Sequence, residues 1–146
     1  MIAENRVATE IVDVAFKVYK GLGPGLFESV YETIMEGELG KRGLGVERQV
    51  GIPVEFEGVR FGLGFRADLL VEGLVIVEIK SVEMVTAVHR KQLLTYLRLA
   101  DKKLGMFDQL QRGLDEGRDC AGGEWVEGGE RRAADLPALG PVRREW

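Results

Sequence analysis

The chain has 146 residues, of which 45% are hydrophobic and 30% charged, and its formal net charge is −4. This composition is typical of a soluble globular domain, and the acidic balance excludes a uniformly basic protein that wraps nucleic acid, although not a local basic groove. A single cysteine, Cys120, excludes an intrachain disulfide and a cysteine-rich zinc site.

The chain does not open with the pattern of a signal peptide, and no apolar run is long enough to span a membrane. No internal repeat is visible. We therefore expect a cytoplasmic protein without a membrane partner.

Two amphipathic helices are predicted first. Apolar residues recur at helical spacing over about residues 2–20, and the glycine-rich stretch 21–25 ends that helix. The spacing of these glycines is not that of a phosphate-binding loop, which indicates a tight turn. A second helix is predicted over about residues 26–41, with Glu28 on an otherwise apolar stripe. A first-turn glutamate is also favoured by the helix dipole, so Glu28 alone has a purely structural interpretation.

Three strands are predicted after the helices, over residues 46–50, 52–56 and 59–71. Gly62 and Gly64 lie inside the third strand. Glycines in a strand indicate a bend, a bulge or a close approach of another backbone.

Residues 66–80 have the pattern of a β-hairpin whose two arms are apolar on successive residues, so both faces should be covered. Asp68 on the first arm and Glu78 and Lys80 on the second interrupt this pattern. A two-residue turn would put the two carboxylates on opposite faces, whereas a three-residue turn over 72–74 puts them opposite each other. We predict the three-residue register, or a bulge with the same effect.

Two carboxylates directly opposite each other repel, and a divalent cation such as Mg²⁺ between them turns the repulsion into a binding site. The alternative is a pair of solvated charges at the end of the hairpin. Lys80 lies two residues after Glu78 and shares its face of the strand, which favours the site.

A third helix is predicted over about residues 87–100, with His89, Gln92 and Tyr96 on one face. Gln92 and Tyr96 are four residues apart, so they can hydrogen-bond jointly. His89 has no partner histidine and is expected to make a polar contact rather than bind a metal. The basic residues of this helix are also typical of a solvated face.

These motif residues resemble the GxxExxY family, in the RecB-like branch of the PD-(D/E)XK nuclease-like superfamily. The resemblance covers residues 2–106 and depends on the order helix, hairpin, helix. It is carried by Gly25, Glu28, Tyr31, Asp68, Glu78, Lys80, Gln92 and Tyr96. Ala67 stands where the superfamily name has proline, at a position that varies among its members.

The resemblance implies a restriction-endonuclease-like α/β/α core with a central mixed β-sheet flanked by helices. It implies that Asp68 and Glu78 bind Mg²⁺ or Mn²⁺, and that Lys80 orients or activates the attacking water. Glu28 would be a further acidic member of the site. The residues implied to support the site or the nucleic acid are Gln92, Tyr96, Tyr31 and His89.

The implied function is that of a metal-dependent nuclease that hydrolyses phosphodiester bonds in DNA or RNA, with a protein partner or as a homodimer. Fold resemblance does not prove activity. The alternative is a catalytically silent nuclease-fold domain that binds nucleic acid or protein, and a third interpretation is a purely structural domain.

The nuclease-like domain is expected to end at residue 106, and residues 107–146 to form an irregular tail, because they are rich in glycine and charge and lack periodicity. The family continues here with a strand and a lysine-aspartate-glycine turn. Shifted by one base, codons permitted from Phe107 onward read L-I-N-F-N-E, which is closer to the family. We therefore interpret the tail as a frameshift product, a hypothesis that the coding sequence across the Met106 codon decides.

Overall fold

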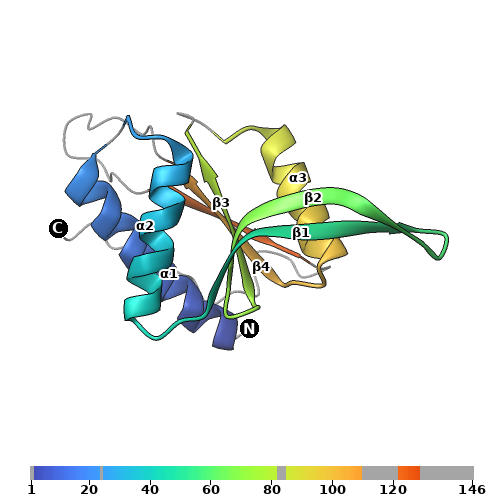
Figure 1. Ribbon diagram of the computed structural model, residues 1–146, viewed down its shortest axis with the longest axis horizontal. Helices are drawn as coiled ribbons and strands as arrows, with labels where there is room; N and C mark the ends of the chain where they lie inside the picture. Colours follow the sequence, from blue (N-terminus) through green and yellow to red (C-terminus); the bar gives the residue numbers. More distant parts are fainter. Residues whose placement is uncertain (1, 24, 82–84, 110–121, 129–146) are drawn as a thin grey trace.

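A computed structural model of the chain describes residues 2–23, 25–81, 85–109 and 122–128 (Figure 1). The helices and strands follow in the order α1 (Ile2–Leu22), α2 (Glu28–Lys41), β1 (Val46–Phe56), β2 (Val59–Val71), β3 (Val75–Lys80), α3 (Ala87–Leu99), β4 (Leu104–Gln109) and β5 (Gly122–Glu127). Within these described ranges, no helix combines the length and the apolar character needed to cross a membrane.

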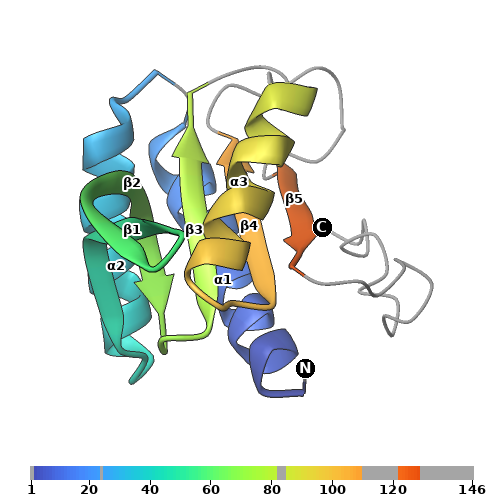
Figure 2. The same ribbon diagram turned by 90° about the vertical axis from the view of Figure 1, so that its right-hand side faces the viewer.

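The strands form one mixed sheet in the order β1-β2-β3-β4-β5. Three of the neighbouring pairs are antiparallel, and β3 pairs with β4 in parallel. A parallel pair needs a long crossover connection, which α3 supplies here. Helices α1 and α2 lie on one face of the sheet and α3 on the other (Figure 2). The expected α/β/α core with a flanked mixed sheet is therefore confirmed.

Strand β3 is apolar along most of its length because its two faces pack into two separate hydrophobic cores. Val77 and Ile79 pack in the core under α1 and α2, whereas Ile76 packs in the core under α3. Burial of both faces explains why the strand lacks the polar alternation of a half-exposed strand. Glu78 and Lys80 are two and four residues after Ile76, so they lie on the face of β3 that α3 covers.

The turn between β2 and β3 has the three residues that were expected. Val71 pairs with Val75 and Leu69 with Val77. Glu72 and Gly73 adopt left-handed φ angles of +53° and +65°, which suit a tight hairpin connection. Continued by one step, this register sets Asp68 opposite Glu78, as the charge pattern predicted.

The structure corrects two of the expected elements. The segments 46–50 and 52–56, expected as two strands, form the single strand β1, with a register shift between Ile52 and Val54. The tail was expected to be irregular from residue 107, and this is wrong for the residues of β4 and β5.

Strand β4 continues through Gln109, and β5 pairs with it antiparallel, with Met106 opposite Trp125. Phe107 and Asp108 are only 1% and 3% exposed, so both belong to the folded core. The rest of the expected tail, residues 110–121 and 129–146, lies outside the described residues. The frameshift origin stays a prediction.

Beyond Ile52, β1 and β2 continue as a two-stranded arm, residues 54–61, that projects from the rest of the sheet (Figure 1). At the base of this arm the two backbones approach closely. A Cβ atom at Gly64 would lie 1.9 Å from the carbonyl oxygen of Ile52, whereas one at Gly62 would meet nothing within 4 Å. Close approach therefore explains Gly64 but not Gly62.

We predict that Gly64→Ala lowers the free energy of unfolding by about 2 kcal/mol or more, because the methyl group forces the two strands apart. The matched variant Gly62→Ala should change it by less than about 0.5 kcal/mol or stabilise the chain slightly. Urea denaturation of both variants measures the difference. Equal effects at the two positions would contradict the close approach.

Candidate active site

Asp68 and Glu78 face each other across β2 and β3, and each is held by the backbone of the opposite strand. The N–H of Asp68 donates to Glu78 Oε1 at 3.2 Å, and the N–H of Ile79 donates to Asp68 Oδ2 at 2.8 Å. Glu78 is 4% exposed and Asp68 is half-buried. Both carboxyl groups are thus fixed in place on the sheet.

The surroundings of this pair disfavour two negative charges. Burial, with a further contribution from Asp68, raises the pKa of Glu78 to about 7 from its ordinary value of 4.5. Burial also raises the pKa of Asp68, although the hydrogen bond from the N–H of Ile79 lowers it in part. An extra positive charge at this place would stabilise both carboxylates.

Lys80 supplies part of that positive charge. Its Nζ lies 3.6 Å from Glu78 Oε2, and its side chain is 25% exposed. The carboxylate is therefore buried while the ammonium group reaches the surface. The ammonium group of Lys80 is therefore accessible to a ligand that approaches from solvent.

Two functional candidates escaped the sequence analysis, Gln49 on β1 and Glu32 on α2. Gln49 Nε2 donates to Asp68 Oδ1 at 3.3 Å and to Glu32 Oε2 at 2.9 Å. Glu32 is 5% exposed, and its other oxygen accepts from Arg48 Nε at 3.0 Å. A chain of hydrogen bonds therefore connects α2 through β1 to Asp68.

A backbone feature explains why the strand pattern concealed Gln49. Successive side chains of a regular strand point to opposite faces, so Arg48 and Gln49 should not reach the same group. Gln49, however, has a left-handed φ of +51°, and both side chains contact Glu32. The available signal was Glu32 itself, which lies one helical turn after Glu28 on the same side of α2.

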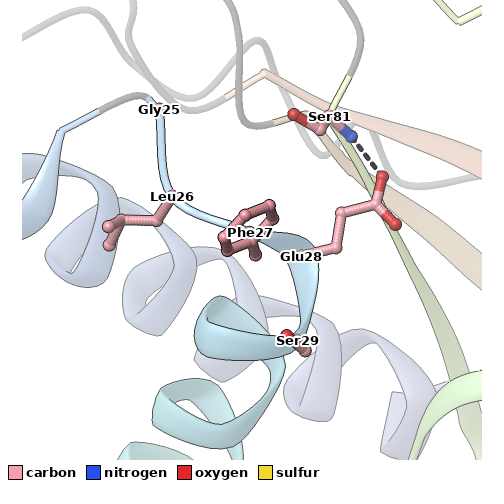
Figure 3. Close-up of a pocket in the computed structure, with 6 residues that line it drawn as sticks. All are labelled: Gly25, Leu26, Phe27, Glu28, Ser29 and Ser81. Atoms are coloured by element: carbon pink, nitrogen blue, oxygen red, sulfur yellow. Dashed lines mark hydrogen bonds between the residues drawn. The ribbon is translucent and has the colours of Figure 1, made fainter.

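Glu28, the first residue of α2, extends to the end of β3. Its Oε1 accepts from the N–H of Ser81 at 2.7 Å, and Ser81 directly follows Lys80 (Figure 3). The glutamate is exposed. The structure therefore brings Glu28 to the lysine end of the site, where it holds the chain after β3.

Helix α3 contributes Tyr96 to the site. The tyrosine is 5% exposed, and its ring lies 4.9 Å from that of Phe65. Burial raises the pKa of Tyr96, and the charges of Glu78 and Asp68 add to this rise. Gln92 lies one turn earlier on the same helix and is half-buried.

The other two expected support residues have different surroundings. Tyr31 is 1% exposed and packs in the core under α1 and α2, where its hydroxyl donates to the carbonyl of Gly23. His89 lies in the first turn of α3, where its Nδ1 accepts from the N–H of Thr86 at 3.2 Å in a capping box. These contacts stabilise the loop before α2 and the start of α3.

The chemistry of the two carboxylates fits a divalent cation. Mg²⁺ is usually held by one or two protein carboxylates and keeps several of its waters. Asp68 and Glu78 offer that donor set, and because burial raises the pKa of both groups, a bound cation would favour their ionised forms. Among the residues that the structure describes, no three His, Cys, Asp or Glu side chains gather into a metal site.

Comparison with known proteins gives one result. A family model described as PD-(D/E)XK nuclease superfamily matches residues 5–113, about three quarters of the chain. The match includes every residue of the candidate site and extends beyond residue 106, where the domain was expected to end. Neither the curated proteins nor the solved structures gave a match.

The raised pKa of Glu78 predicts how stability depends on pH. The folded protein binds this proton more tightly than the unfolded chain, so the free energy of unfolding should fall as pH rises from about 4.5 to about 7. The shift corresponds to about 3 kcal/mol. Glu78→Gln should reduce this fall and stabilise the chain at pH 8 by roughly 1–3 kcal/mol in EDTA.

Urea denaturation at pH 5, 6, 7 and 8 in EDTA measures this dependence. Glu55→Gln, at an exposed position of the arm, is the control and should leave the profile unchanged. If the Glu78→Gln chain is less stable than the wild type at pH 8, an ionised Glu78 does not destabilise the folded protein, and the prediction is wrong.

Proposed function

Because the chain belongs to the PD-(D/E)XK nuclease superfamily, we propose that it is a metal-dependent nuclease that hydrolyses phosphodiester bonds of DNA or RNA. The observation that carries this proposal is the facing pair Asp68 and Glu78 with Lys80 beside it. Within the superfamily, we assign the chain to the GxxExxY family of the RecB-like branch from the order of its motifs.

Asp68 and Glu78 would hold the metal ion, either Mg²⁺ or Mn²⁺. When bound, this ion supplies the positive charge that polarises the phosphate and acidifies a nearby water. The carboxylates are held by strand N–H groups, so they need little rearrangement before binding. Such preorganisation reduces the cost of assembling a charged site.

Lys80 would act on the substrate. Its ammonium group lies at the edge of the site, beside the buried carboxyl group of Glu78. A phosphate oxygen that approaches this edge meets the ammonium group, which stabilises the negative charge that grows as water attacks phosphorus. The bond from phosphorus to the leaving oxygen then breaks.

Helix α2 would position both strands of the site. Glu28 holds Ser81 after β3, and Glu32 acts through Gln49 on Asp68 of β2. Tyr96 and Gln92 would support the site from α3.

The alternative function, a silent domain that binds protein or nucleic acid, is supported by the β1–β2 arm. Phe56, Val59 and Phe61 are 64%, 55% and 50% exposed there. Exposed apolar side chains that lie together mark sites of protein association. A protein partner or a second copy of the chain is therefore the partner class that the arm favours.

Metal binding tests the nuclease proposal. Calorimetry with Mg²⁺ and Mn²⁺ should show binding by the wild-type chain and at least tenfold weaker binding by Asp68→Asn and Glu78→Gln, which each remove one ligand charge. Lys80→Ala should retain metal binding and lose roughly 100-fold in hydrolysis of labelled DNA or RNA. A folded wild-type chain that binds neither ion and cleaves neither nucleic acid would favour the alternative.

A separate prediction concerns Gln49. Gln49→Met keeps the length of the side chain but removes the donor to Asp68, so it should weaken Mg²⁺ binding about tenfold. Arg48→Met removes a partner of Glu32 without touching Asp68 and should change Mg²⁺ affinity by less than about twofold. Calorimetry compares the two, with urea denaturation to show that both fold. Equal weakening would mean that Gln49 acts only by supporting Glu32.

A further inference from the structure

The G-x-x-E-x-x-Y segment builds a fixed wall beside the proposed site. The hydroxyl of Tyr31 donates to the carbonyl of Gly23, which holds the chain before α2 against the helix. Gly25 has a φ of +99°, a conformation that favours glycine. Glu28 fastens the start of α2 to Ser81. Three motif residues thus fix the position of the segment between them.

This segment and the end of β3 enclose an open pocket of about 540 Å³. Its lining residues come from the start of α2, the turn before it and the end of β3 (Figure 3): Gly25, Leu26, Phe27, Glu28, Ser29 and Ser81. Pockets that take small organic groups have volumes of about 300–1,000 Å³. Because Ser81 directly follows Lys80, the pocket adjoins the lysine end of the site.

Phe27 is the unusual residue of this wall. Its side chain is 82% exposed, whereas that of Tyr31, four residues later, is 1% exposed. In Figure 3 the ring lies between Leu26 and the carboxylate of Glu28 that reaches Ser81. A flat aromatic surface kept in water beside a phosphodiester site is suited to stack on a nucleobase.

We propose that this pocket binds an unpaired nucleobase that stacks on Phe27, so that the substrate is a single-stranded segment or a frayed end. The proposal rests on the nuclease function proposed above and specifies its substrate. A base must leave its duplex stack before it can lie against a protein ring. The phosphate next to this base would then lie toward Lys80.

The charge of the pocket favours a base over a phosphate as its occupant. Glu28 contributes a carboxylate to the lining, which repels phosphate. A carboxylate has several acceptor positions, so Glu28 can accept from the exocyclic amine of a base while it also accepts from Ser81. Lys80 directly precedes Ser81 at the end of β3, so its ammonium group is the contact expected for the phosphate.

The test measures binding of short fluorescent oligonucleotides by anisotropy in EDTA, where hydrolysis does not occur. Phe27→Leu keeps an apolar side chain but removes the ring, and should weaken single-strand binding roughly tenfold. Phe27→Trp should retain or strengthen it. Val88→Ala, which removes an apolar side chain that is 72% exposed on α3, is the matched control and should have no effect.

The proposal also requires the wild-type chain to bind the single strand more tightly than the corresponding blunt duplex. Equal binding by Phe27→Leu and wild type, tighter binding of the duplex, or no oligonucleotide binding would each overturn it. Because the assay needs neither metal nor cleavage, a Phe27-dependent complex stands even if the chain hydrolyses nothing. Hydrolysis without dependence on Phe27 would leave the nuclease proposal intact and remove only this one.

Discussion

The carboxyl groups of Asp68 and Glu78 face each other across the β2–β3 hairpin, and the rest of the site depends on this arrangement. Each carboxyl group is held by an N–H group of the other strand, so neither can turn away from the other. Burial makes their joint ionisation unfavourable, and the pKa of Glu78 rises to about 7. Lys80 and Gln49 lie where they partly offset this cost. Local instability of this kind is common at functional sites, because activity is retained at the expense of stability.

Helix α2 connects segments of the chain that are far apart in sequence. Glu28 and Glu32 lie one turn apart, and one acts on the end of β3 while the other acts on β1 and, through Gln49, on β2. A shift of this helix would therefore disturb both sides of the carboxylate pair. The motif on α2 thus has a positioning role that is separate from any direct contact with a metal ion.

The hairpin register could be predicted because the two turn lengths place Asp68 on different faces, and only one of them groups the charges. Gln49 could not be predicted, since its left-handed φ of +51° comes from the surrounding contacts and not from a glutamine preference. Strand β5 was missed for a related reason. Residues 122–127 contain two glycines and two glutamates, and pairing with β4 supplies the order that their own propensity lacks.

The position of α1 has a consequence for synthesis of the protein. This helix is translated before the other described elements, yet Ile11 and Val14 are buried in a core that also contains Leu104 and Met106. On the ribosome its apolar face can pack against α2 early, but it is fully covered only after most of the described chain has been translated. The hairpins β1–β2 and β2–β3 connect near neighbours and can form sooner, since short loops close at lower entropic cost. The nascent chain thus exposes part of the apolar face of α1 until β4 is made, and exposed apolar surface of this kind is what chaperones protect from aggregation.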